Sequence, residues 1–200
     1  MLSRREVKRR IENLTQLPTS PRAIAPALSA FLAPGAATPS FHEVVRSDPA
    51  LAAGVLRAFP SAQNRSAGSG TGAARQVPFP EASALPASAA GETVLSAALD
   101  YLAAGDMNED VLDSLWRRSL QTAFLAQYLA ENAEGVEPAD AYLAGLLHNA
   151  GKLALMAACP EALGALLEDD ADWAADRSLE KEQQALGVDH TLAGKWLGER

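Results

Sequence analysis

The sequence predicts an all-α fold, a multi-helix bundle that forms a single domain over residues 1–200. Apolar residues recur three and four positions apart through most of the chain, which is typical of amphipathic helices. No segment shows the alternation of apolar and polar residues expected of a half-buried strand. Hydrophobic residues make up 48% of the chain and alanine dominates them, which favours helices that approach one another closely.

The first half predicts four helices. One covers residues 1–14 and carries a stripe of apolar residues on one face. The next begins at Ser20-Pro21, an N-cap followed by proline at the first helical position, and ends before Pro34. A capping box opens a short helix at Ser40, and Asp48 caps the helix after it.

The first helix is basic, and two interpretations remain open for it. Its cationic residues form either a patch for nucleic acid or acidic lipid, or the solvated face of a helix that docks on the domain. The formal net charge of −8 disfavours a general role on nucleic acid. The cationic residues are Arg4, Arg5, Lys8, Arg9 and Arg10.

Residues 59–91 lose the helical periodicity and are rich in Gly, Pro and Ser. We expect a long flexible loop there, with residues 62–76 mobile and easily cleaved. The glycines at 68–72 follow no strand and lack the lysine of a phosphate-binding loop.

The second half predicts further helices. They cover residues 92–104 and about 109–131, then begin at Pro138, Pro160, Ser178 and near Asp189. The 109–131 helix is expected to bury a broad face. The residues of that face are Val111, Leu112, Leu115, Trp116, Leu120, Ala123, Phe124, Gln127, Tyr128 and Leu129.

Residues 140–156 are the most informative stretch. Their apolar residues predict a buried helix that breaks or bends near Gly151. The polar pair His148-Asn149 ends the apolar run, and a buried imidazole and amide need hydrogen-bonding partners.

This stretch, L-A-G-L-L-H-N-A-G-K-L, resembles the central L-L-H-D-I-G-K motif of the HD superfamily, and in particular of its signalling branch, the HDOD domain. Four other segments resemble HDOD motifs in the same order: residues 17–23, 44–57, 115–119 and 186–197. The resemblance implies an all-α signalling module that acts through protein–protein interactions, some of them linked to nucleotides. HDOD domains usually continue with further helices, so we expect the corresponding face to be covered by a partner or a second copy, or the chain to be a shortened form.

The resemblance also implies a degenerate metal site. Active HD enzymes hold metal through an early His, the His-Asp pair and a later Asp. Here Arg118 stands where the early His is expected and Asn149 replaces the Asp of the pair, leaving His148. A guanidinium has no lone pair for a metal, and a carboxamide is a poor substitute for a bridging carboxylate. We therefore expect no metal, no cofactor and no catalytic residue.

The remaining polar residues leave two alternatives. Arg118, His148 and Asn149 form either a pocket for an anion or a hydrogen-bonded cluster that fixes a helix crossing, with Arg118 held by neighbouring acceptors. Lys152, Asp189 and His190 are further candidates for a binding pocket. As structural groups, Lys152 would be solvated, Asp189 would cap a helix and His190 would bond locally.

Composition limits the other classes of function. The single cysteine, Cys159, fits a reducing compartment, and neither a signal peptide nor a membrane-spanning run of about 18 apolar residues is present. We expect a cytoplasmic, non-enzymatic bacterial signalling module that binds a signalling protein or forms homo-oligomers. The alternative is a divergent metal-dependent phosphohydrolase or phosphodiesterase.

Overall fold

A computed structural model describes residues 2–32, 41–58, 95–97, 99, 109–169 and 179–199. The expected loop at 59–91, with its mobile part at 62–76, lies outside the described residues. Of the helix expected at 92–104, only 95–97 and 99 are described, and these residues are helical.

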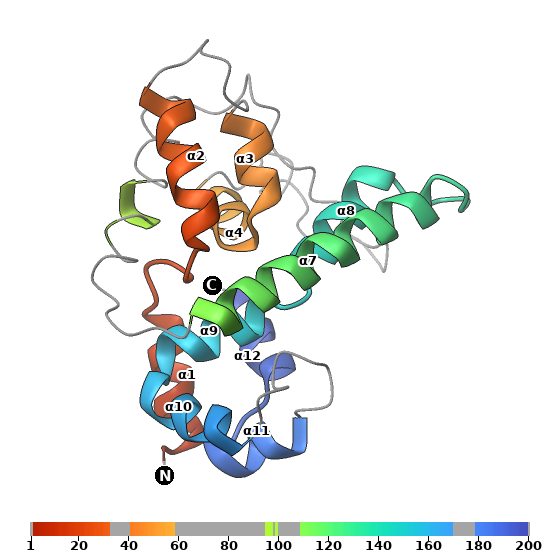
Figure 1. The fold of residues 1–200 in the computed structure, drawn as a ribbon. Helices are drawn as coiled ribbons and strands as arrows, with labels where there is room; N and C mark the ends of the chain where they lie inside the picture. The colour runs from red at the N-terminus through yellow and green to blue at the C-terminus, as the bar shows by residue number, and fades with distance from the viewer. Residues whose placement is uncertain are drawn as a thin grey trace.

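Every regular element within the described residues is a helix, which confirms the all-α prediction (Figure 1). None of the described helices is long and apolar enough to cross a membrane. In chain order the helices are α1 (Arg4–Glu12), α2 (Pro21–Leu32), α3 (Phe41–Ser47), α4 (Pro49–Ala58), α7 (Glu109–Ala130), α8 (Pro138–Leu147), α9 (Ala150–Ala158), α10 (Pro160–Asp169), α11 (Leu179–Leu186) and α12 (His190–Gly198).

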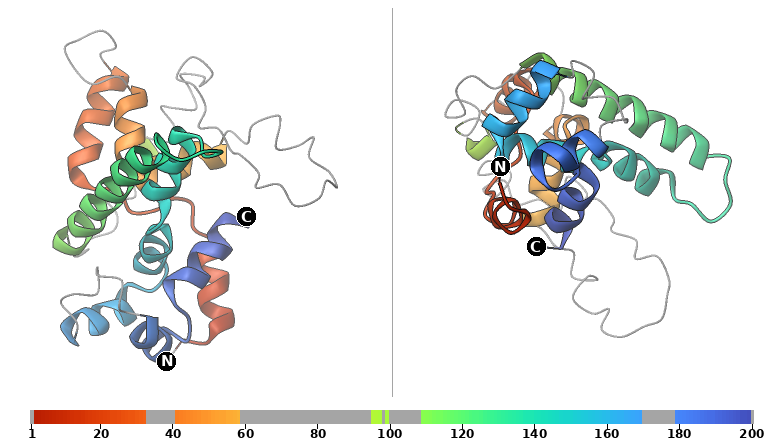
Figure 2. Two further views of the ribbon diagram at one scale, coloured as in Figure 1. Left: turned by 90° about the vertical axis from the view of Figure 1, so that its right-hand side faces the viewer. Right: turned by 90° about the horizontal axis from the view of Figure 1, so that it is seen from below.

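The helices form two groups joined by α7 and α8. Helices α2, α3 and α4 pack together at one end, and α1, α9, α10, α11 and α12 form the other (Figures 1 and 2). Helix α9 is the centre of the second group, because it packs against α1, α4, α10 and α12. All of its residues except Ala157 are buried.

The basic helix α1 docks on α9 and α12 through its apolar stripe. Ser3 caps it by accepting from the backbone N–H of Glu6, and Val7 and Ile11 are fully buried. Its cationic side chains contact both the helix itself and the body: Arg9 and Arg10 donate to Glu6, and the Lys8 ammonium lies 5.9 Å from the ring centre of Trp196 in α12.

Asp48 links the start of α2 to the start of α4. Its carboxylate accepts from the backbone N–H groups of Ala50 and Leu51, which confirms the predicted cap, and also from that of Ser20 before α2. Burial raises the pKa of Asp48 to about 6, although these three donors lower it.

Helices α7 and α8 form a hairpin whose outer part projects from the body as an arm (Figure 1). We define the arm as residues 120–142. At its base Gly145 packs so closely on α7 that a Cβ would lie 2.7 Å from the Ala123 Cα. Tyr142 donates its hydroxyl to the Arg46 carbonyl oxygen at 2.9 Å, which fastens the arm to α3.

The expected broad buried face of α7 is wrong in its second half. Leu112, Leu115 and Ala123 are buried as expected, but Phe124, Tyr128 and Leu129 are 60–67% exposed. The reason is geometric: beyond Ala123 the helix leaves the body, so that α8 covers only one of its sides (Figure 1).

The expected break near Gly151 lies slightly earlier. Helix α8 ends at Leu147 and α9 begins at Ala150, so His148 and Asn149 form the turn between them. Gly151 instead serves a close crossing, because a Cβ there would lie 1.8 Å from the carbonyl oxygen of His190 in α12.

We expect Gly151→Ala to lower the free energy of unfolding by about 3 kcal/mol or more, because the added methyl group would push α9 away from the α12 backbone. Gly198→Ala is the matched control: a Cβ there meets no atom within 4 Å. Urea denaturation of both variants measures the difference. Equal midpoints for the two variants would contradict the close crossing.

We expect Asp48 to make the protein less stable as the pH rises from about 4 to 7. Its pKa is about 6 when folded and its ordinary value is 3.8, so its stabilising contribution is complete below pH 3.8 and is lost as the pH rises through about 6. The full change is about 3 kcal/mol.

Asp48→Asn isolates this effect, since the amide does not titrate. The free energy of unfolding of the variant relative to the parent should increase over this pH range. A difference that stays constant with pH would show that the Asp48 carboxyl does not titrate there.

Candidate functional site

The candidate site starts at the turn between α8 and α9. The Nδ1 atom of His148 lies 2.7 Å from the carbonyl oxygen of Gly145. A carbonyl only accepts, so Nδ1 carries the hydrogen and Nε2 is the ring's acceptor when the imidazole is neutral. His148 itself is exposed.

Asn149 is buried, in contrast to its neighbour. It is 1% exposed, and its backbone carbonyl accepts from the N–H of Lys152 at 2.9 Å. Its side-chain Nδ2 atom is buried without a hydrogen-bonding partner. A neutral carboxamide enclosed in this way is a poor metal ligand.

Arg118 is not enclosed, contrary to the expectation that neighbouring acceptors hold it in a cluster with His148 and Asn149. Its side chain is exposed on α7. The buried stripe of α7 follows Leu112, Leu115, Ser119 and Ala123, and Arg118 lies to one side of that stripe. Ser119 takes the inward position instead, and its buried hydroxyl has no hydrogen-bonding partner.

Lys152 also differs from expectation. We expected it to be solvated, but it is fully buried. The cause is the position of α9, which packs against four helices and whose first turn is buried. The methylene stem of a lysine suits such a place, whereas its ammonium group needs polar partners.

Asp189 and His190 lie at the start of α12. As expected, Asp189 caps the helix and His190 bonds to a nearby residue. Asp189 accepts from the N–H of Leu192 at 2.9 Å. Burial raises the pKa of Asp189, but donors from Thr191, Leu192 and Gln183 outweigh burial and lower the pKa below its ordinary value. The local partner of His190 is Glu182.

Sequence reasoning missed Glu182, which holds the start of α12. It is fully buried, and its carboxylate accepts from the His190 backbone N–H at 2.6 Å and lies 2.8 Å from the His190 Nδ1 atom. A glutamate within a polar run such as E-K-E-Q-Q predicts exposure, so no local signal identified it.

A cavity of about 820 Å³ lies between residues 14–17, α4, the α8–α9 turn and α12. Two of the predicted site residues, His148 and His190, line it together, whereas Arg118, Asn149, Lys152 and Asp189 do not. Arg57 lines it too, and donates to the Leu14 and Thr15 carbonyl oxygens. The sequence analysis did not single out Arg57, although this residue ends the 44–57 motif.

The described residues contain no group of three or more His, Cys, Asp or Glu side chains that could hold a metal ion. Cys159 is buried, and burial raises the pKa of its thiol, which disfavours the reactive thiolate.

Comparison with known proteins establishes the family. The HDOD domain model matches residues 89–200, which is more than half of the chain, and the chain therefore belongs to the HDOD domain family. No curated protein sequence matches it.

Two solved structures resemble this fold, both of the MmoQ response regulator from Methylococcus capsulatus strain Bath, at 25% identity. One, at 2.4 Å resolution, has a TM-score of 0.70, and the match covers 94% of this chain and 73% of that one. The other, a fragment of residues 20–298, has a TM-score of 0.64 and covers 92% and 68% respectively.

We expect Glu182→Ala to destabilise the protein by about 1–3 kcal/mol, because it removes the acceptor for the backbone and ring N–H groups of His190. Glu180→Ala is the matched control, since Glu180 is exposed on the same helix. Thermal or urea unfolding measures both. If the two variants unfold alike, Glu182 does not anchor α12.

Proposed function

We propose that this HDOD domain is a non-catalytic signalling module that works by binding other proteins. Family membership and the likeness to a response regulator support the signalling role. The observation that carries the interaction role is the exposed apolar face of the arm, where Phe124, Leu125, Tyr128 and Leu129 are 60–67% exposed. Exposed apolar residues gathered on one helix typically mark a protein-binding surface.

The chemistry of the α8–α9 turn argues against catalysis by the HD route. That route uses anionic carboxylate to hold metal and to lower the pKa of a bound water. Asn149 supplies a buried carboxamide instead, and exposed Arg118 replaces a ligand by a cation. His148 and His190 remain at the cavity, but two imidazoles without a carboxylate make an incomplete set of ligands.

The basic helix α1 gives little support to a nucleic-acid role. Glu6 binds both Arg9 and Arg10, and Lys8 lies within 3.5 Å of Glu12. A surface that binds phosphate needs cations available to displace counterions. Acidic partners on the same helix compete for these cations, so we assign α1 to docking on α9 and α12.

Metal content tests the non-catalytic proposal. We expect the purified protein to contain no stoichiometric Fe, Mn, Zn or Mg and to hydrolyse neither phosphodiester nor nucleotide substrates, because the carboxylate of the pair is missing. Elemental analysis after dialysis, with His148→Ala as the matched variant, measures this. Stoichiometric metal that is lost in His148→Ala, together with hydrolysis, would establish the metal-dependent alternative.

A further inference from the structure

The outer face of the arm combines apolar and charged residues in a particular order. We define this face as the exposed residues from Arg117 of α7 to Glu131, which directly follows the last residue of that helix. It begins with two arginines and ends with an acidic tip, and its four large apolar side chains lie between them. The order is Arg117 and Arg118, then Phe124, Leu125, Tyr128 and Leu129, then Glu131. Arg117 already pairs with Asp113 on the same helix, so Arg118 supplies the positive charge of this face.

The acidic end continues beyond the helix. Glu134 and Glu137 follow in the turn before α8, and both are exposed. No lysine or arginine occurs between Arg118 and Lys152. The outer face therefore runs from positive through apolar to negative along one helix.

This order is self-complementary in one orientation. Two copies of α7 packed antiparallel about a twofold axis near Phe124 and Leu125 bring Arg118 of each copy to the acidic end of the other, since position 118 is as far before this axis as position 131 is beyond it. A parallel pairing would place like charges side by side. We propose that the arm is a homodimerisation element, in which the outer faces of two copies pack antiparallel.

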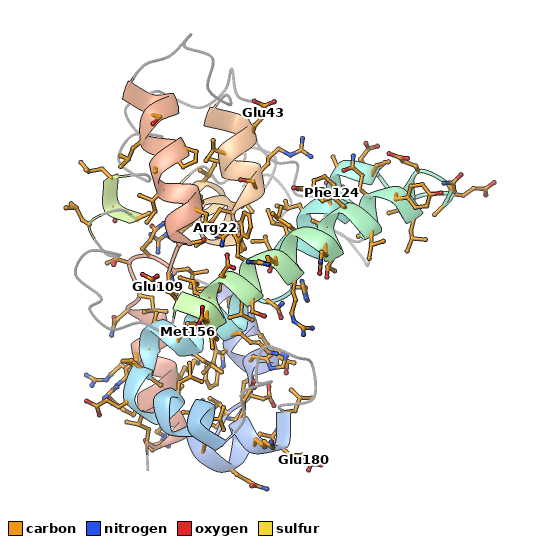
Figure 3. The ribbon with its side chains drawn as sticks, in the orientation of Figure 1. Arg22, Glu43, Glu109, Phe124, Met156 and Glu180 are labelled. Carbon is orange, nitrogen blue, oxygen red and sulfur yellow. The ribbon has the colours of Figure 1, made fainter. Side chains whose placement is uncertain are left out.

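The shape of the molecule permits this pairing. The arm projects from the body, and the body lies at the N-terminal end of α7 (Figures 1 and 2). Antiparallel packing therefore places the two bodies at opposite ends of the paired helices. Phe124 lies on the projecting part of α7 (Figure 3). Its ring contacts that of Tyr142 edge-to-face at 5.5 Å, so Phe124 forms the edge of the outer face next to α8.

The expected dimer is weak. A fully covered aromatic side chain buries about 150–250 Å², so two aromatic and two leucine side chains supply only part of the roughly 800 Å² per partner of a standard interface. We therefore expect dissociation in the micromolar range, about 1–100 μM. An equilibrium of this strength responds to local protein concentration, which suits a signalling module.

Sedimentation velocity from about 5 to 300 μM tests the proposal, because this range brackets a micromolar equilibrium. The parent should shift from monomer to dimer. Leu125→Asp should remain monomeric, since it places a carboxylate at the twofold axis. The matched control is Leu179→Asp, which changes an exposed leucine on α11 and should dimerise like the parent.

Charge reversal tests the orientation. Arg118→Glu alone and Glu131→Arg alone should each weaken dimerisation about tenfold, because each brings like charges together. Combining the two should restore most of the loss. Circular dichroism and a thermal melt of each variant exclude unfolding as the cause. A double variant as weak as the single ones would overturn the antiparallel pairing.

This inference rests on the proposed interaction role. A second measurement distinguishes a failure of dimerisation from a failure of the interaction role. A monomeric parent at every concentration would overturn dimerisation. If the parent, but not Leu125→Asp, then captured a different protein from a lysate of the host, the outer face would still be an interaction surface for that protein. If neither protein captured anything, the proposed interaction role would be overturned together with dimerisation.

Discussion

The backbone approach between α9 and α12 at Gly151 is the constraint on which the rest of the structure depends. It brings the helix that follows the His148-Asn149 turn against the start of α12, and no side chain fits between them. Helix α9 can then contact α1, α4, α10 and α12 together, and it becomes the buried centre of the larger core. The position of His190 beside the cavity follows from the same contact. A close crossing of this kind gains dispersion contacts along both backbones, and only glycine allows it.

The start of α12 is secured by polar groups as well as by packing. Asp189, the residue directly before α12, caps the helix by accepting from the Leu192 N–H. Glu182 of α11 contacts the His190 backbone N–H and imidazole ring. A buried carboxylate is costly unless its oxygen atoms are bonded, and the two His190 donors offset part of that cost. These directional bonds specify one position for His190, whereas apolar packing alone tolerates several. The imidazole therefore lines the cavity in a defined orientation.

Sequence periodicity predicted the described helices well, and most of their ends, because caps such as Ser20, Asp48 and Asp189 are local signals. It did not predict what covers each face. The apolar stripe of α7 continues past Ala123, and nothing local shows that the body ends there and leaves Phe124 exposed. The burial of Lys152 likewise comes from helices distant in sequence. The family motif included two segments that line the cavity, at His148 and at 44–57, but it did not show the side of α7 on which Arg118 lies.

The position of the His148-Asn149 pair in the structure shows why a motif predicts a fold better than it predicts an activity. Within its motif, the apolar residues and Gly151 are needed for α8 and α9 to pack, whatever chemistry the turn performs. A carboxylate at the second residue of the pair would serve metal binding and is not needed for this packing. In this chain that position carries a buried amide whose backbone begins α9, so the turn keeps its architectural role without the charge that metal chemistry requires. The packing that makes the family recognisable therefore does not depend on which side chain follows His148.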